Sequence, residues 1–252
     1  ILCFWKLLRM TDIFDFKFRH LKMKKKYTLE IIRLGLPSGI TQAIFSMAMV
    51  IVQSLTNSFG EMVIAANVII MRVDGFAMMP NFSFGTAMTT YAGQNVGAHR
   101  MDRVEQGARQ GTAIALGTSA VITLLILVFG KNLMAIFTDT SELVTLSANM
   151  MKILAVGYLA MAITQSLSGV MRGAGDTMTP MWISMVVTVV IRVPLAYDLA
   201  FLTRTPELPN GRYQVLWISM LVSWCMGALL TLIFYKKGNW KKKALTGSSS
   251  EK

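Results

Sequence analysis

Residues 213–235, YQVLWISMLVSWCMGALLTLIFY, contain no Lys, Arg, Asp or Glu, and this stretch decides the fold class. A helix needs roughly 20 consecutive apolar residues to cross the hydrocarbon core of a bilayer. Five further stretches share this lack of charge: residues 34–60, 75–98, 110–130, 153–171 and 177–191. The last of them is short, but it extends past one arginine to about residue 200. The sequence therefore predicts an all-α, polytopic membrane protein with a six-transmembrane-helix bundle.

Composition supports a membrane protein and argues against a nucleic-acid partner. Hydrophobic residues make up 54% of the chain and charged residues 15%, too few to cover a water-exposed surface. The formal net charge of +12 is concentrated in residues 6–26 and 236–243. Membrane proteins keep Lys and Arg in cytoplasmic segments, whereas a nucleic-acid-binding protein spreads them along one folded face. The lipid bilayer is therefore the expected partner.

The distribution of Lys and Arg also predicts the topology. Six crossings return the chain to its starting side, and the basic ends place both termini in the cytoplasm of a multi-pass protein of the cell membrane. Four segments are expected along the chain. Residues 1–8 are the end of a preceding transmembrane helix, and residues 9–28 are a basic cytoplasmic linker. Residues 29–236 form the six-helix lobe, and residues 237–252 are a basic polar cytoplasmic tail. The expected helices cover about residues 29–59, 62–96, 107–130, 150–172, 178–201 and 213–236. We expect a short polar turn at residues 99–106, a helix on the outer interface within 131–149, and a kink at Pro194.

Glycines recur four residues apart at the predicted cytoplasmic helix ends. The pairs are Gly35/Gly39, Gly93/Gly97, Gly107/Gly111 and Gly169/Gly173. Small residues at this spacing let two helix backbones approach closely in lipid. One hypothesis is that these glycines pack the cytoplasmic gate of a cavity. The alternative is that they cap helices or pack without a gating role.

Three ionisable residues, Arg72, Asp74 and Arg192, are predicted at membrane depth, where charge is costly and therefore indicates function. Arg72 and Asp74 are two positions apart and do not face each other on a helix, so each needs another partner. The two residues mark a possible ion or ion-pair site. Asp74 either handles a proton or a cation, or forms a structural ion pair with a basic residue of another helix.

No arrangement of residues predicts an enzyme. The chain has no nucleotide-binding loop, no paired catalytic carboxylates and no Ser/His/Asp set, so it is not expected to hydrolyse ATP. Cys3 and Cys225 lack both metal-site spacing and a disulfide pattern, and neither a metal nor a cofactor is expected.

Several short motifs together resemble a known family. They are GLPS at residues 35–38, GQNVGA at 93–98, GVMRGAGDT at 169–177 and RVPLAY at 192–197. In this order they are similar to the C-terminal half of a multidrug and toxic compound extrusion (MATE) transporter, over about residues 29–235. The resemblance implies one lobe of a twelve-helix, two-lobe secondary antiporter that exports drugs, often organic cations, in exchange for H⁺ or Na⁺. The partner would be the N-terminal lobe of the same chain, and a coupling ion would take the place of a cofactor.

The sequence departs from the family pattern at one position that matters. Many members place a Glu eight residues after the proline that matches Pro37, and here that position is Phe45. This departure favours a main coupling carboxylate in the N-terminal lobe, and H⁺ slightly over Na⁺. The present lobe would then form the cavity wall. Its expected substrate contacts are Gln42, Phe45, Asn67 and Gln165.

Two alternatives remain open from the sequence. A lipid-linked oligosaccharide flippase of the same superfamily would need a cavity lined with many Arg and Lys residues. Only Arg72 and Arg192 are predicted within the membrane, which argues against it. A non-transporting membrane scaffold would be favoured by long soluble loops, which the pattern does not contain.

Overall fold

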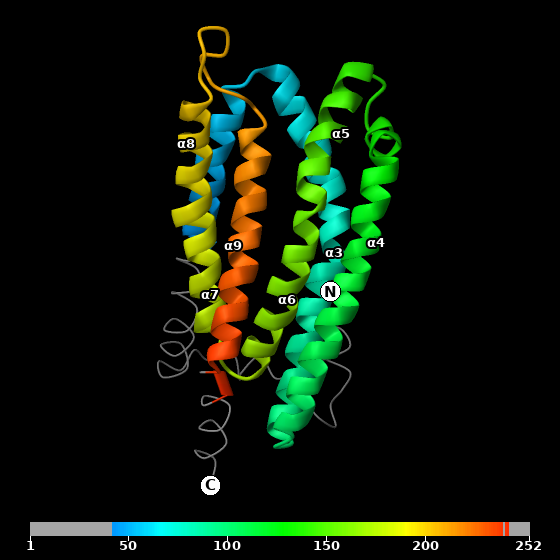
Figure 1. The fold of residues 1–252 in the computed structure, drawn as a ribbon, viewed down its shortest axis with the longest axis vertical. Coiled ribbons are helices and arrows are strands. Elements are labelled where there is room, and N and C mark those ends of the chain that lie inside the picture. Colours follow the sequence, from blue (N-terminus) through cyan, green and yellow to red (C-terminus); the bar gives the residue numbers. More distant parts are fainter. Residues whose placement is uncertain (1–41, 239, 242–252) are drawn as a thin grey trace, which may run out of the picture. The chain divides into compact units, whose positions relative to one another are not determined.

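The computed structural model describes residues 42–238 and 240–241, and this part of the chain is almost entirely helical (Figure 1). The chain forms two compact units, Ile1–Ile44 and Phe45–Lys252, and every labelled helix belongs to the second. A first helical segment is described over residues 42–57. It is followed by α3 (Glu61–Gly97), α4 (Met101–Ala135), α5 (Ser141–Ala155), α6 (Gly157–Gly173), α7 (Met178–Met185), the π-helix η2 (Val186–Arg192), α8 (Val193–Leu202) and α9 (Val215–Lys237).

Four stretches of the described chain are long and apolar enough to cross a membrane: Glu61–Gly97, Met101–Ala135, Met178–Leu202 and Val215–Lys237. The helices α5 and α6 meet at a bend of 45°, and they make a fifth span if they are counted as one. The prediction of an all-α, polytopic membrane protein is therefore confirmed. The first predicted crossing, residues 29–59, lies partly outside the described residues.

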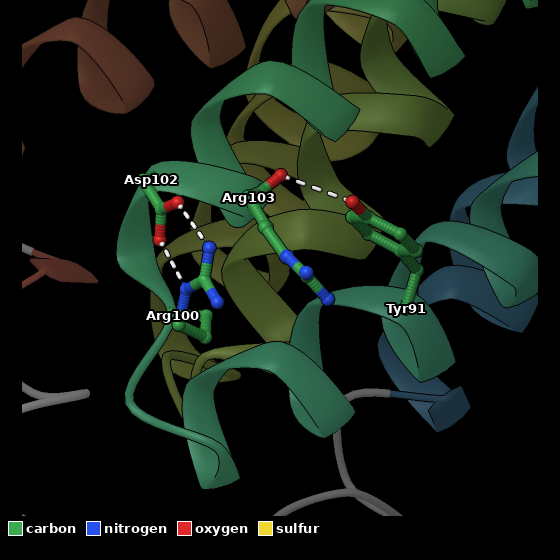
Figure 2. Close-up of polar contacts among 4 residues, drawn as sticks. All are labelled: Tyr91, Arg100, Asp102 and Arg103. Carbon is green, nitrogen blue, oxygen red and sulfur yellow. Dashed lines mark hydrogen bonds and ion pairs between the residues drawn. The ribbon is translucent and has the colours of Figure 1, made fainter.

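The turn between α3 and α4 is shorter than the sequence predicts. We expected residues 99–106 to form a polar turn, but α4 already begins at Met101. His99 makes the turn with a φ of 56°, and the Arg100 guanidinium donates two hydrogen bonds, of 3.1 and 2.9 Å, to the Asp102 carboxylate (Figure 2). These bonds raise the pKa of Arg100 above its ordinary value. An acidic residue in the first turn also complements the helix dipole, so this polar segment is stable as helix.

The segment between the third and fourth predicted crossings also differs from expectation. Instead of one helix on the outer interface within residues 131–149, α4 continues to Ala135 and α5 starts at Ser141. The alternation of apolar and polar residues within 131–149 correctly predicts helix, but α5 buries one side against the bundle. Ser147, Ala148 and Met151 are fully buried on that side. Burial of this face joins α5 to the core.

The stretch 178–202 changes helix type in its middle. Residues Val186–Arg192 form a π-helix, and α8 begins with Pro194 at its second position. A proline has no N–H to donate and its ring collides with the preceding turn, so the wider turn before it relieves that contact. The predicted irregularity at Pro194 thus takes the form of a π-helix on its N-terminal side.

The GVMRGAGDT motif forms the connection from α6 to α7. Gly175 has a φ of 88°, and the N–H of Asp176 donates to the Met171 carbonyl at 2.9 Å, which closes the end of α6. The Asp176 carboxylate then accepts hydrogen bonds from the Thr179 N–H and hydroxyl, at 3.3 and 2.7 Å. This residue therefore holds the first turn of α7 and is 2% exposed. The motif is a helix-reversal element in this fold.

Candidate functional site

The centre of the candidate site is a carboxylate on α3 held by a phenol from α6. The Tyr158 hydroxyl donates a hydrogen bond of 2.8 Å to Oδ1 of Asp74. Tyr158 is fully buried, just after the bend between α5 and α6. Gly157 lets this end of α6 approach α9, because a methyl group there would lie 2.6 Å from the Trp224 ring. The rings of Tyr158 and Trp224 are 5.8 Å apart, so this close approach fixes the position of the phenol.

Arg192, the last residue of η2, brings a positive charge close to this carboxylate. Its two terminal nitrogens lie 3.6 and 3.5 Å from the sulfur atoms of Met49 and Met220. Its Nε is buried and has no hydrogen-bond partner among the described residues. Arg192 is within electrostatic range of Asp74 but makes no ion pair with it. Thioethers are weak acceptors, so the guanidinium charge is only partly compensated.

Asp74 and Arg192 line a cavity of about 150 Å³ between helices of the second unit. A water needs roughly 10–15 Å³ of such space, so the cavity has room for several waters or a small cation with part of its hydration shell. Its polar wall contains Asp74, Arg192, Asn67, Gln53 and Thr56. Methionines 49, 71 and 220 and Trp217 supply much of the apolar wall. Carboxylate, amide and hydroxyl oxygens facing one small cavity can bind a proton or a hard cation.

The structure separates the residues that the sequence singles out. Asp74 and Asn67 line the same cavity, about two helical turns apart on one face of α3. Arg72 is exposed and does not line it, as expected for a residue two positions from Asp74. Phe45 is half-buried and is not part of the lining, and Gln42 lies in the other compact unit.

Gln165 belongs to a different level of the bundle. Its carbonyl oxygen lies 3.2 Å from the position of a methyl group at Gly85, three helical turns along α3 from Asp74. At 1.5 Å per residue this is about 16 Å. The four expected substrate contacts are thus not brought together within one described cavity.

Sequence reasoning missed Tyr158, which makes the only hydrogen bond to Asp74 among the described residues. No local signal distinguishes it, because a tyrosine inside an apolar run is ordinary. Arg192 is recognisable as an intramembrane charge, but its proximity to Asp74 depends on how η2, α3 and α9 pack. The residues next to Arg192 in the sequence do not indicate that it lies close to Asp74.

A second feature, at the other end of α3, is a close backbone contact with α6. A methyl group at Gly169 would lie 2.3 Å from the Gly85 carbonyl oxygen. At Gly173 a methyl group would lie 2.3 Å from the Thr89 carbonyl oxygen. Ordinary contacts start near 3.4 Å, so only glycine permits this approach.

The same end of α3 also packs closely on α4. Methyl groups at Gly107 and Gly111 would lie 2.1 Å from Cε1 of Tyr91 and 2.3 Å from the sulfur of Met88. Figure 2 shows the Tyr91 hydroxyl donating to the backbone carbonyl of Arg103, at 3.1 Å, which holds the ring over the first turns of α4.

The remaining glycines differ from this pattern. A methyl group at Gly93 would make an ordinary contact of 3.4 Å with the Gly173 carbonyl, and nothing lies within 4 Å of one at Gly97. The close contact expected at Gly97 is therefore absent, because the last residue of α3 faces open space. Gly35 and Gly39 lie outside the described residues. A gating role of this end stays a prediction.

A family model and individual relatives point to the same protein family. The family model described as MatE matches residues 37–197. The probable multidrug resistance protein YoeA of Bacillus subtilis (strain 168) is 28% identical over 228 residues, which covers 90% of this chain and 48% of that protein. The probable multidrug resistance protein NorM of Thermotoga maritima is 27% identical over 216 residues, with 86% and 45% covered.

Solved structures agree in fold. The inward-facing conformation of a multidrug resistance MATE family transporter of the MOP superfamily matches with a TM-score of 0.76 at 19% identity. The match covers 90% of this chain and 52% of that one. The chain thus spans about half the length of the curated relatives it matches.

Proposed function

The chain belongs to the MatE family, and on that premise we propose that it forms one lobe of a secondary active antiporter. The transporter exports drugs or organic cations in exchange for H⁺ or Na⁺, and the coupling ion serves in place of a cofactor. The second lobe is the N-terminal half of the same transporter, and substrate binds between the two. The relatives named above are multidrug resistance proteins, which supports small-molecule substrates.

The location is the cell membrane, with the end that carries the α3–α4 turn in the cytoplasm. Arg100, Arg103 and Arg109 gather at this end, together with Lys236 and Lys237 in the last turn of α9. Cytoplasmic segments of membrane proteins carry an excess of such residues. The close glycine contacts of α3 with α4 and α6 are at the same end, where they form the packed, cytoplasmic side of the transport pathway.

One observation supports a coupling role for Asp74 in this lobe, beside the main carboxylate expected in the N-terminal lobe: Asp74 lines an intramembrane cavity and has a single hydrogen bond. Tyr158 occupies Oδ1, so Oδ2 is the oxygen that takes up a proton or contacts a cation. When no ion is bound, Arg192 compensates the carboxylate charge from across the cavity. Ion binding weakens that attraction and frees Arg192 and η2 to shift, and this links the ion to lobe movement.

The balance of charge in the cavity argues against a large anionic substrate. It contains one Asp and one Arg, and the other polar groups are neutral. A transporter for a lipid-linked oligosaccharide would need several basic groups facing its substrate. Methionine walls are flexible and polarizable, which suits ligands of different shape.

The test is ethidium efflux by the complete transporter in a drug-sensitive host that lacks its own pumps. Efflux is measured separately under an imposed proton gradient and an imposed Na⁺ gradient. We expect Asp74→Asn to lower gradient-driven efflux at least tenfold under the ion that drives the wild type. Asp198→Asn is the matched control, because Asp198 is an exposed carboxylate in the second half of α8.

The outcomes separate the proposals. Unchanged efflux in Asp74→Asn would remove this residue from coupling while leaving the export function in place. Absence of efflux by the wild type under both gradients, with normal membrane insertion, would remove the drug-export function itself.

A further inference from the structure

A second, larger cavity lies between α4, α6 and α9 at the basic end of the bundle. Its volume is about 950 Å³, and in Figure 1 α6 runs between the two helices that form its sides. Along α4 and α9 the lining is mostly polar near the α3–α4 turn, an end that we call the mouth, and apolar farther along both helices. The polar residues are Asp102, Glu105, Gln106, Arg109, Gln110 and Lys236, and the apolar ones include Ala113, Leu116, Leu167 and Leu232. We call this cavity the α4–α9 groove.

The length of the groove matches one leaflet of a bilayer. From Gln106 to Leu116 the lining follows α4 for about 15 Å at 1.5 Å per residue. The hydrocarbon core is about 30 Å thick, so the groove reaches from the headgroup region to about the middle of the membrane. Tyr235 lies in its lining, an aromatic residue with a hydroxyl of the kind enriched at membrane interfaces.

The charges at the mouth are not balanced. Asp102 is paired with Arg100 at 2.9 Å, and Glu105 is paired with Lys241. Both carboxylates of the lining thus have a basic partner outside it. Arg109 and Lys236 are exposed, and neither makes an ion pair within the part of the chain that the structure describes. Two uncompensated cations and two amide side chains therefore face the mouth.

We propose that the α4–α9 groove binds an anionic phospholipid of the cytoplasmic leaflet. Arg109 and Lys236 hold the phosphate, Gln106 and Gln110 donate to the headgroup oxygens, and an acyl chain lies along Ala113 and Leu116 of α4. Basic groups above an apolar channel complement an amphipathic anion in both charge and polarity. The site is separate from the Asp74 cavity and does not depend on the transport function.

The test is native mass spectrometry of the full chain in detergent, with added palmitoyl-oleoyl phosphatidylglycerol or phosphatidylcholine. We expect the anionic lipid to bind at least tenfold more tightly. The double substitution Arg109→Gln/Lys236→Gln should remove that preference, since each basic group near a headgroup contributes roughly a fivefold change. Arg204→Gln/Arg212→Gln is the matched control, because it removes the same charge at the opposite end of the bundle.

A second pair of variants tests the apolar half of the site. Ala113→Trp fills the groove and should weaken phosphatidylglycerol binding several-fold. Ala120→Trp is the control, because Ala120 is an exposed alanine of the same helix that does not line the groove. Soluble glycerol phosphate should not displace the lipid.

Four results would overturn the proposal. The first three are equal binding of the two lipids, equal loss in both double variants, and displacement by glycerol phosphate, which would indicate a free-anion site. Retained binding in Ala113→Trp would show that the lipid lies elsewhere.

Discussion

The close contact of α6 with α3 makes Gly173→Ala a sharp test of the fold. The added methyl group would lie 2.3 Å from the Thr89 carbonyl oxygen, 2.8 Å from Cβ of Ala92 and 3.0 Å from the Gly93 nitrogen. Two of these three atoms are backbone, so no side chain can rotate away. To reach an ordinary contact of 3.4 Å, the two helices must separate by about 1 Å.

The cost follows from the packing of the two helices. Overpacking of a well-packed contact destabilises by roughly 1–3 kcal/mol. A loss of about 2 kcal/mol lowers the midpoint of thermal unfolding by roughly 4–8 °C for a chain of this size. We expect that shift in detergent-solubilised protein, followed by intrinsic tryptophan fluorescence. Gly173→Leu should have a larger effect and should also abolish ethidium efflux if this end closes the transport pathway.

Gly97→Ala is the matched control. It changes the same residue type at the same end of the bundle, but nothing lies within 4 Å of the added methyl group. Alanine is also the better helix former, so stability should stay equal or rise slightly. A Gly173→Ala protein as stable as the wild type would refute the backbone contact. So would an equal loss in the two variants.

Two further predictions concern buried aromatic side chains. Tyr158→Phe removes the hydrogen bond to Asp74 and should lower stability by about 1.5–3 kcal/mol, the range for bonds to charged groups. Tyr213→Phe is its control, because the Tyr213 hydroxyl makes no hydrogen bond in the described chain, and similar losses in the two variants would contradict the assigned bond. Trp240→Ala should cost about 3–5 kcal/mol, since Trp240 is fully buried and stacks on a neighbouring ring at 5.2 Å. Trp182→Ala, at a side chain that is 53% exposed, should change the unfolding midpoint little, and a comparable drop there would argue against the assigned burial.

Much of the helix pattern could be predicted from the sequence, and the errors have a common cause. The predicted range 62–96 and the observed α3 differ by one residue at each end. The predicted range 107–130 is shorter than α4, because charge-free length reports the part inside the hydrocarbon and not the whole helix. Where a helix continues into water, polar residues such as Asp102 and Glu105 stabilise it, and hydropathy no longer marks its end.

The candidate site could be predicted only in part. Asp74 is recognisable because a carboxylate inside an apolar run is costly. Arg72 cannot be its partner, because residues two positions apart on a helix do not face each other. The partners that the structure supplies, Tyr158 and Arg192, are far away in sequence and come from α6 and η2. The expected contacts Phe45 and Gln165 fall outside the cavity for the same reason.

The sequence by itself determined that this protein lies in a lipid bilayer, and it determined the number and length of its apolar segments. Those properties depend on the transfer of each residue between water and hydrocarbon, which is local. Only the tertiary structure decided which polar groups meet, such as Asp74 with Tyr158. It also decided which glycines are indispensable, because the contact at Gly173 and the open space at Gly97 differ only in what the neighbouring helices place there.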